Sequence, residues 1–374
     1  MQSIDVDATG EGRMRSQVRP VVLCAFLACG APFVWPLPAA ADSDLPRRPK
    51  APAETYAHAN VIYDSVRDSH GERARVILTR PREGSGKFPA IFVAGWLSCD
   101  SVEAPADTDD ASGKVFRVLA ELPEFVTVRM DKPGVGDSEG VCAETDFDTE
   151  LSAYRAAFRS LSRYGFIDPA KVFVFGISNG GGFAPLIADG APVRGYVIDG
   201  GWIKTWFEHM IEIERRRFVL SGKAPGDIND LMRSVTRLYE AYLLEKQRPA
   251  EVFAHHPDLR AAWAGDDDDH LYGRPVAFYQ QLQQLNLESA WSKVSAPVLV
   301  LHGQYDWIMS RDDHERIVAL VNLRLPGAAK FVELPGTGHT FEHYENEQAA
   351  FKFKAAAFDP RSANMIADWL RQHR

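Results

Sequence analysis

The chain lacks several features that would place it in a specialised class. Its 374 residues include 42 Lys and Arg against 51 Asp and Glu, which gives a formal net charge of -9. A nucleic-acid-binding protein needs a basic face to neutralise phosphates, so this shortage of positive charge argues against that class. Metal-ligand spacings such as His-Glu-x-x-His are also missing, so neither a metal nor an organic cofactor is implied. The expected partner is a small molecule, and the sequence does not indicate an oligomeric state.

The chain also lacks an uninterrupted apolar run long enough to cross a membrane, which takes about 20 residues. Its most apolar stretch, at residues 20–37, is shorter than that and is broken by proline. Three arginines precede this stretch and PAAADS follows it, the layout of a signal peptide cleaved after Ala41. A lipoprotein acylated at Cys29 is the alternative, with Phe26 where such signals usually carry Leu. We therefore expect a secreted or periplasmic protein without a permanent membrane span.

Cysteine is scarce. Removal of the signal peptide would take away Cys24 and Cys29 and leave Cys99 and Cys142 in the exported chain. An even pair of cysteines in an oxidising compartment favours a disulfide, and two free thiols are the alternative.

Strand and helix patterns alternate along most of the remaining chain. Segments 60–66 and 74–80, on either side of a turn-like RDSHGE, predict an antiparallel strand pair. The apolar run FPAIFVAGW at 88–96 is typical of a strand buried on both faces. Further strands are expected at 124–131, 171–177, 193–200, 297–303 and 330–336, and helices at 113–122, 148–164 with Asp148 as N-cap, 181–190, 311–321 and near 362–372. This repetition predicts a mostly parallel sheet with helices on both faces.

The alternation stops between Gly201 and about Lys293. Three stretches there have helical periodicity and no strand pattern, which predicts an α-helical cap inserted after the sixth strand of the sheet. GDDDDH at 265–270 is expected to be a solvated loop. The expected organisation is a signal peptide at 1–41, a flexible tether at 42–57, an α/β core at 58–200 and 294–374, and the cap at 201–293.

The stretch VFVFGISNGGGFAPL, at 172–186, contains the first candidate for chemistry. Its G-x-S-x-G pattern around Ser178 is weak alone in a chain with 28 glycines. Here, however, the pattern lies between a buried strand and a helix, which is the context that a nucleophile elbow requires. Glycines on either side would let strand and helix approach, while a strained serine backbone presents Oγ at the carboxyl edge of the sheet.

A serine hydroxyl needs a base to take its proton, and the base needs an acid to fix its tautomer. Asp306 follows the strand at 297–303, and His339 follows the strand at 330–336. Taken singly, Asp306 could be a turn-former and His339 a loop histidine, and His302 is a rival base. The order Ser, Asp, His along the chain is that of one hydrolase fold. From about residue 60 onward the sequence resembles an α/β hydrolase, possessing the elbow and both downstream residues.

The resemblance implies an α/β fold with a mostly parallel eight-stranded sheet, in which His302 occupies a non-catalytic His-Gly pair. It also implies an oxyanion hole formed by the backbone N–H groups of Asn179 and of Trp96 or Leu97, after an Ala-Gly pair in place of the family's usual His-Gly. In the family's sheet the third and fourth strands are neighbours. Cys99 and Cys142 would then meet at its carboxyl edge, in a disulfide that braces the oxyanion loop. The segment RMDKPGVGDSEG at 129–140 resembles the family's glycine-rich turn and is interpreted as architectural.

The cap is expected to cover the site and to select the substrate. Its aromatic residues are candidates for an apolar pocket, although each could instead pack between cap helices: Trp202, Trp206, Phe207, Tyr272, Phe278 and Tyr279. ERRRF at 214–218 would either attract an anionic substrate or form a solvated helix face.

The predicted function is hydrolysis of carboxylic esters through an acyl-enzyme on Ser178. A thioesterase and a serine peptidase of the aminopeptidase or prolyl-oligopeptidase type are alternatives with the same three residues. For an aminopeptidase, Glu208, Glu212 and Glu214 are candidate partners of a substrate amine. A non-catalytic binding protein on this scaffold is the remaining alternative.

Overall fold

A computed structural model describes residues 45–47, 52–354 and 357–374. The predicted signal peptide at 1–41, with its alternative acylation site at Cys29, lies outside the described residues, as does part of the tether. No helix in the described ranges is long and apolar enough to cross a membrane.

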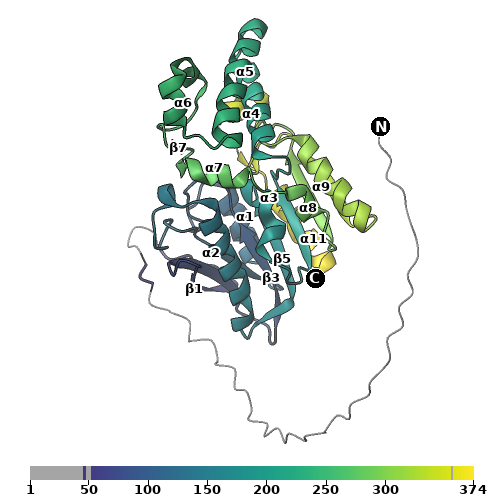
Figure 1. The fold of residues 1–374 in the computed structure, drawn as a ribbon. Helices are drawn as coiled ribbons and strands as arrows, with labels where there is room; N and C mark the ends of the chain where they lie inside the picture. The colour runs from purple at the N-terminus through teal and green to yellow at the C-terminus, as the bar shows by residue number, and fades with distance from the viewer. Residues whose placement is uncertain (1–44, 48–51, 355–356) are drawn as a thin grey trace, which may run out of the picture. The chain divides into compact units, whose positions relative to one another are not determined.

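A single eight-stranded sheet forms the centre of the described chain, in the order β1-β2-β4-β3-β5-β6-β9-β10 (Figure 1). Its strands are β1 (Ala59–Arg67), β2 (Arg73–Pro81), β3 (Phe88–Ala94), β4 (Val126–Met130), β5 (Ile167–Ile177), β6 (Gly195–Asp199), β9 (Val298–Gly303) and β10 (Ala329–Leu334). β2 pairs antiparallel with β1 and β4, and the other neighbours pair parallel. The predicted strand pair and mostly parallel sheet are therefore confirmed.

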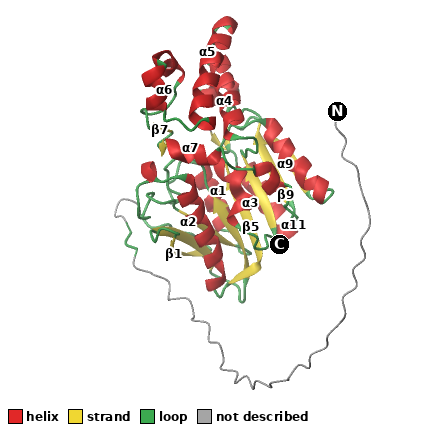
Figure 2. Cartoon of the chain, viewed as in Figure 1, coloured by secondary structure: helices red, strands yellow, loops and turns green. Residues whose placement is uncertain are grey.

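Helices cover both faces of the sheet, as the red and yellow elements of Figure 2 show. One face packs against α1 (Ala111–Ala120) and α11 (Pro360–His373), and the other against α2 (Phe147–Ser160), α3 (Asn179–Ile187), α8 (Leu287–Trp291) and α9 (Arg311–Arg324). In β5, Val172 and Val174 belong to one core cluster, whereas Phe173 and Phe175 belong to the other. Because both faces are buried, this strand is a continuous apolar run rather than an alternating one.

The cap between β6 and β9 is mainly helical, and Figure 1 shows α4, α5 and α6 extending beyond the sheet. It contains α4 (Trp206–Leu220), α5 (Pro225–Tyr239) with a π-helical turn at Glu240–Leu244, α6 (Pro249–His255), a 3-10 helix at Pro257–Ala262, and α7 (Val276–Leu282) before α8. The acidic stretch at 265–270, expected to be only a loop, leads into a short hairpin of β7 (His270–Leu271) and β8 (Arg274–Pro275). Tyr272 and Gly273 both have positive φ, 49° and 71°, as the type I′ turn of a two-residue hairpin requires.

Some expectations about local structure were wrong. The N-cap of α2 is Asp146, whose carboxylate accepts a hydrogen bond from the N–H of Thr149, whereas Asp148 lies inside the first turn. Both positions suit a carboxylate, because the first turn has unpaired N–H groups and the positive end of the helix dipole. The hairpin of β11 (Glu342–His343) and β12 (Ala357–Phe358) and the short α10 (Glu347–Phe351) were not predicted.

Candidate active site

Ser178 lies at the sharp turn between β5 and α3. Its backbone has φ 55° and ψ -123°, a conformation that costs energy for any residue with a Cβ. The turn is held by hydrogen bonds from the Ser178 N–H to the Asp199 carbonyl, at 2.8 Å, and from the Gly181 N–H to the Ser178 carbonyl, at 2.9 Å. A Cβ at Gly176 would lie 2.7 Å from the carbonyl oxygen of Gly180. A Cβ at Gly180 would lie 2.3 Å from the carbonyl oxygen of Ala94. Glycine is therefore required on both sides of the serine.

The structure brings Ser178, His339 and Asp306 together in one hydrogen-bonded chain. Oγ of Ser178 lies 2.8 Å from Nε2 of His339, and Nδ1 of His339 lies 2.9 Å from Oδ2 of Asp306. Oδ1 of Asp306 accepts hydrogen bonds of 2.9 Å from the N–H groups of Ile308 and Met309. The carboxylate is thus fixed by its own loop and orients the imidazole toward the serine.

The charges in this chain suit proton transfer at neutral pH. Burial by itself would raise the pKa of Asp306, but the adjacent His339 outweighs it and the pKa falls to about 2. Burial would likewise lower the pKa of His339, but Asp306 raises it above its ordinary value. An ionised Asp306 therefore lies where it stabilises a protonated His339.

His302, the rival base, does not join this chain. It is buried against His314, with the two ring centroids 4.6 Å apart, and burial lowers its pKa. His314 in turn accepts a hydrogen bond from the N–H of Gly201 and contacts the carbonyl of Ser310. Both rings pack the interior behind the site.

The loop after β3, here called the oxyanion loop (residues 95–103), lies beside the serine. The carbonyl oxygen of Gly95 accepts a 3.0 Å hydrogen bond from the N–H of Gly180, which ties the loop to the start of α3. Within the described ranges, no hydrogen bond uses the N–H of Trp96, Leu97 or Asn179. These groups are therefore free to bind a negatively charged oxygen.

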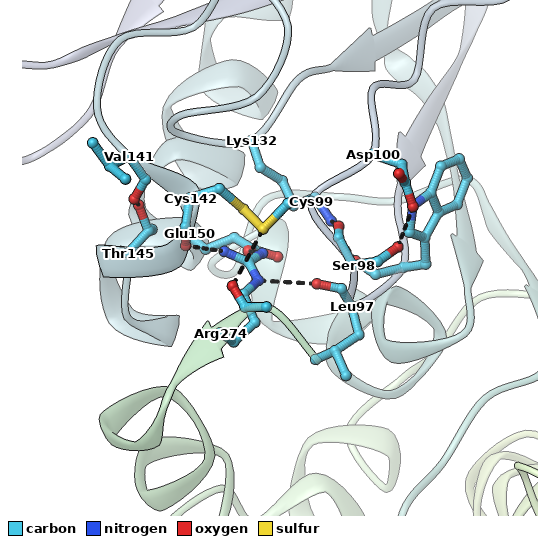
Figure 3. The surroundings of a disulfide bond; sticks show 12 residues. Leu97, Ser98, Cys99, Asp100, Lys132, Val141, Cys142, Thr145, Glu150 and Arg274 are labelled. Carbon is cyan, nitrogen blue, oxygen red and sulfur yellow. Dashed lines mark hydrogen bonds and ion pairs between the residues drawn. A yellow bond between two sulfur atoms is a disulfide. The ribbon is translucent and has the colours of Figure 1, made fainter. Parts of the chain in front are cut away.

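The predicted disulfide between Cys99 and Cys142 is present, with a Cα–Cα distance of 6.0 Å (Figure 3). It joins the oxyanion loop to the segment after β4, and β3 and β4 are neighbours in the sheet. In that segment Gly134 and Gly136 have positive φ, as the glycine-rich turn requires.

Residues 90–352 match the alpha/beta hydrolase family. The chain belongs to the alpha/beta hydrolase family. Similar solved structures include a hypothetical protein from Pseudomonas aeruginosa, 16% identical, with a TM-score of 0.52 over 85% of this chain and 95% of that one. Est1E from Butyrivibrio proteoclasticus, with ferulic acid bound, is also 16% identical, with a TM-score of 0.52 over 83% of this chain and 98% of its own.

A putative dipeptidyl aminopeptidase IV from Bacteroides ovatus is 10% identical, with a TM-score of 0.51 over 85% of this chain and 36% of that one. At these identities the likeness concerns the fold alone. No match to the chain was found among curated proteins.

A cavity of about 730 Å³ opens beside Ser178 and His339 in this alpha/beta hydrolase. Its apolar wall is formed by Trp96, Leu97, Trp206, Met210, Ile213, Tyr272, Trp307, Ile308, Met309 and Phe353. Polar residues of its lining include Asp100, Glu103, Thr108, Asp110 and Ser112. None of the described residues that line the cavity is a Lys or an Arg. No group of three or more His, Cys, Asp or Glu in the described chain could hold a metal ion.

Only two of the six aromatic candidates from the cap, Trp206 and Tyr272, line this cavity. Trp202 is fully buried, and its Nε1 donates a 3.0 Å hydrogen bond to Oδ1 of Asn179. The remaining three pack in the core: Phe207 is partly buried against it, and Phe278 and Tyr279 are fully buried. For these four, packing between elements is the observed role.

Several cavity residues were missed by the sequence analysis. Met210 and Ile213 lie four and seven residues after Trp206, so they share one face of α4. That spacing could have identified them. Ile308 and Met309 lie two and three residues after Asp306 and reach the cavity because their N–H groups bind its carboxylate.

The charged residues of α4 do not face the cavity. Glu208 caps α4 with Thr205, Glu212 pairs with Lys204 at 2.5 Å, and Glu214 pairs with Arg217. In ERRRF, Arg216 donates to the carbonyls of Trp307 and Ile308, both at 2.7 Å. Arg216 therefore attaches α4 to the loop after β9, whereas the three glutamates interact within α4 or with residues just before it. None of these side chains lines the cavity, so neither a substrate amine nor an anionic substrate meets them there.

Proposed function

We propose that this protein hydrolyses carboxylic esters through an acyl-enzyme on Ser178. The observation that carries the proposal is the hydrogen-bonded chain from Oγ of Ser178 through His339 to Asp306, at 2.8 and 2.9 Å. The reaction also needs two donors for a tetrahedral oxyanion, and the N–H groups of Asn179 and of Trp96 or Leu97 supply them.

In the first half of the reaction, Oγ of Ser178 attacks the acyl carbonyl carbon while Nε2 of His339 takes the hydroxyl proton. The oxyanion that forms is stabilised by the two N–H groups, and the imidazolium by Asp306. When the intermediate collapses, the C–O bond to the alcohol breaks and His339 gives its proton to the departing oxygen. In the second half, His339 takes a proton from water, the hydroxide attacks the acyl-enzyme, and the acid leaves as Ser178 recovers its proton.

The cavity supports small, largely apolar esters without negative charge. Its volume of about 730 Å³ suits a single small molecule, and its wall is aromatic and aliphatic beside the reacting serine. Acidic residues and the absence of Lys and Arg from the described lining disfavour substrates that carry a carboxylate.

An aminopeptidase is a second candidate, because the acidic residues of the cavity could bind a substrate amine. Two of them are already occupied, however. Glu103 pairs with Arg47 at 2.5 Å, and Asp110 caps α1 by accepting from the N–H of Gly113 at 2.6 Å. Ester hydrolysis is therefore the better supported of the two.

The test compares p-nitrophenyl esters and thioesters with aminoacyl and prolyl anilides on the purified protein. We expect turnover of the neutral p-nitrophenyl esters, labelling of Ser178 by a fluorophosphonate probe, and loss of both in Ser178→Ala. Ser98→Ala, a change to another serine of the cavity wall, should still be labelled. Full esterase activity in Ser178→Ala, or failure of well-folded wild type to react with the probe, would overturn the proposal.

We also propose that the protein is exported and begins at Asp42 after cleavage of its signal peptide. The arginines and apolar run of residues 13–37 support this. N-terminal sequencing of the protein recovered from the periplasm or medium tests it. An intact N-terminus on protein retained in the cytoplasm would contradict it, and a lipid on Cys29 would support the alternative anchor.

A further inference from the structure

Three successive carbonyl oxygens of the oxyanion loop accept hydrogen bonds from buried cationic side chains. Nζ of Lys132 donates to the carbonyl of Trp96, at 2.6 Å, and to that of Ser98. Nε of Arg274 donates to the carbonyl between them, that of Leu97, at 2.9 Å. Figure 3 shows the Arg274 guanidinium between Glu150 and the Leu97 carbonyl, next to the disulfide. Two cations from distant parts of the chain thus hold one short run of backbone.

Both side chains are buried where a charge needs partners. Lys132 is 1% exposed and Arg274 is fully buried. Burial lowers the pKa of Lys132 to about 8, so its position is unfavourable for an ammonium group unless nearby acceptors compensate. Arg274 is paired with the fully buried carboxylate of Glu150 and donates to the carbonyl of Cys142 at 3.2 Å. Its other hydrogen bond is the one to the Leu97 carbonyl of the oxyanion loop.

Peptide geometry connects these contacts to the reaction. In a trans peptide the C=O and N–H bonds point in opposite directions. With the Trp96 carbonyl held by Lys132, the N–H of Leu97 must point the other way. The carbonyl of Gly95 is held by the N–H of Gly180, which fixes the N–H of Trp96 in the same manner. Rotation of one of these peptides would bring a carbonyl oxygen toward a position meant for an oxyanion, and the resulting repulsion would oppose the transition state.

We infer that Lys132 and Arg274 are positioning residues that hold the peptides of the oxyanion loop with their carbonyls away from the reacting oxygen. This inference rests on the proposed ester hydrolysis and adds to it. Arg274 begins β8, directly after the hairpin turn whose Tyr272 lines the cavity. The cap therefore supplies one of the supports of the oxyanion loop, as well as part of the substrate wall.

The experiment replaces Lys132 with Met, which keeps the length and removes the donors. We expect kcat for p-nitrophenyl butyrate to fall about 10²-fold while KM changes less than about twofold, because the support acts on the transition state alone. Affinity for an alkyl trifluoromethyl ketone, whose serine adduct carries an oxyanion, should fall by a similar factor. Lys171→Met, an exposed position on β5, is the matched control and should leave both values unchanged.

A second variant keeps the inference testable if Lys132→Met does not fold. Arg274→Gln combined with Glu150→Gln removes both members of the buried pair, so neither is left as a lone charge. It also removes the carboxylate that favours the Lys132 ammonium, and it should lower kcat with little change in KM. Folding of each protein is checked by circular dichroism.

The outcomes separate the two proposals. Wild type that neither hydrolyses esters nor labels at Ser178 would overturn the proposed function and this inference with it. Active wild type with folded variants of unchanged kcat, or with a raised KM alone, would overturn only the positioning role. If neither variant folds, Lys132 and Arg274 serve stability and the inference fails.

Discussion

The two sides of the candidate active site are held in place by different means. On the nucleophile side, Ser178 is fixed by its own turn, in which glycines remove every Cβ that would clash and backbone hydrogen bonds hold the strained φ. On the oxyanion side, the loop after β3 has no regular structure and is held by side chains from elsewhere, together with a disulfide. The nucleophile side is therefore determined by one short stretch of sequence, whereas the oxyanion side depends on contacts between residues that are far apart in the chain.

The largest expected effect is on the nucleophile side, at Asp306. In Asp306→Asn the carboxylate that fixes the His339 tautomer is lost, so kcat should fall about 10⁴-fold. Because Asp306 raises the pKa of His339, and His339 must be neutral to act as base, the acid limb of kcat/KM in wild type should have its midpoint above 6.5. In the variant that midpoint should move to lower pH.

Rate profiles between pH 4 and 9 measure both effects of this substitution. Asp312→Asn, on the exposed first turn of α9, is the control and should alter neither the rate nor the midpoint. An unchanged kcat in Asp306→Asn would show that another group orients His339.

Removal of the disulfide tests how the oxyanion loop is held in place. Loss of Cys99–Cys142, which spans 43 residues, should lower the free energy of unfolding by about 3 kcal/mol in Cys99→Ala/Cys142→Ala. Lys132 and Arg274 still hold the loop carbonyls in this variant, so kcat should fall less than in Lys132→Met. Urea unfolding and ester kinetics on the same preparation measure both quantities. A larger loss of kcat than in Lys132→Met would mean that the disulfide, and not the cations, sets the loop geometry.

The same contrast explains what could be predicted from the sequence. The elbow can be recognised in the sequence because a buried strand, the Ser178 pattern and a helix follow one another within 172–186. Asp306 and His339 were found because each follows a strand of the sheet. The oxyanion-loop supports were missed because Lys132 and Arg274 lie 36 and 177 residues from the carbonyls they hold, in segments interpreted as an architectural turn and as part of a helical cap. Sequence periodicity marks a side chain as buried but not what buries it.

The aromatic residues of the cap illustrate this last limit. Trp202 and Trp206 are equally plausible pocket residues in the sequence, and their rings lie 4.9 Å apart in the structure. Only Trp206 reaches the cavity, because Trp202 turns its indole toward Asn179 at the elbow. Which of two neighbouring tryptophans meets a substrate depends on how α4 is placed over the sheet, and that placement is a property of the whole fold.

A smaller effect is expected at Gly180, where the elbow meets the oxyanion loop. Gly180 donates its N–H to Gly95, and a Cβ on it would lie 2.3 and 2.5 Å from the carbonyl oxygens of Ala94 and Gly95. Gly180→Ala should therefore push the elbow and the oxyanion loop apart, lowering kcat and destabilising the fold by about 2 kcal/mol. Gly226→Ala in α5, where a Cβ meets nothing within 4 Å, is the matched control and should be neutral or slightly stabilising. Equal thermal stability of the two variants would show that the junction adjusts to the added methyl.

The smallest expected effect concerns the charge of the substrate, which the oxyanion side controls. Asp100 of the oxyanion loop lines the cavity, and no Lys or Arg is among the described wall residues, so its charge should repel a carboxylate on the acyl chain. Glu103 lines the cavity as well, but its charge is paired with Arg47. The p-nitrophenyl monoester of succinate should have a kcat/KM about tenfold below that of its methyl-capped form, a difference of about 1.4 kcal/mol that added salt reduces.

Asp100→Asn removes this charge and should narrow the difference in kcat/KM between the two esters, whereas Asp109→Asn, outside the cavity wall, should not. A preference for the carboxylated ester would contradict the assignment of the acidic wall to substrate selection. Because Asp100 also accepts a 2.6 Å hydrogen bond from Oγ of Ser98, a fall in kcat for both esters would instead show that this acid supports the oxyanion loop. The two esters thus distinguish selection by the wall from support of the loop, at a residue that belongs to both.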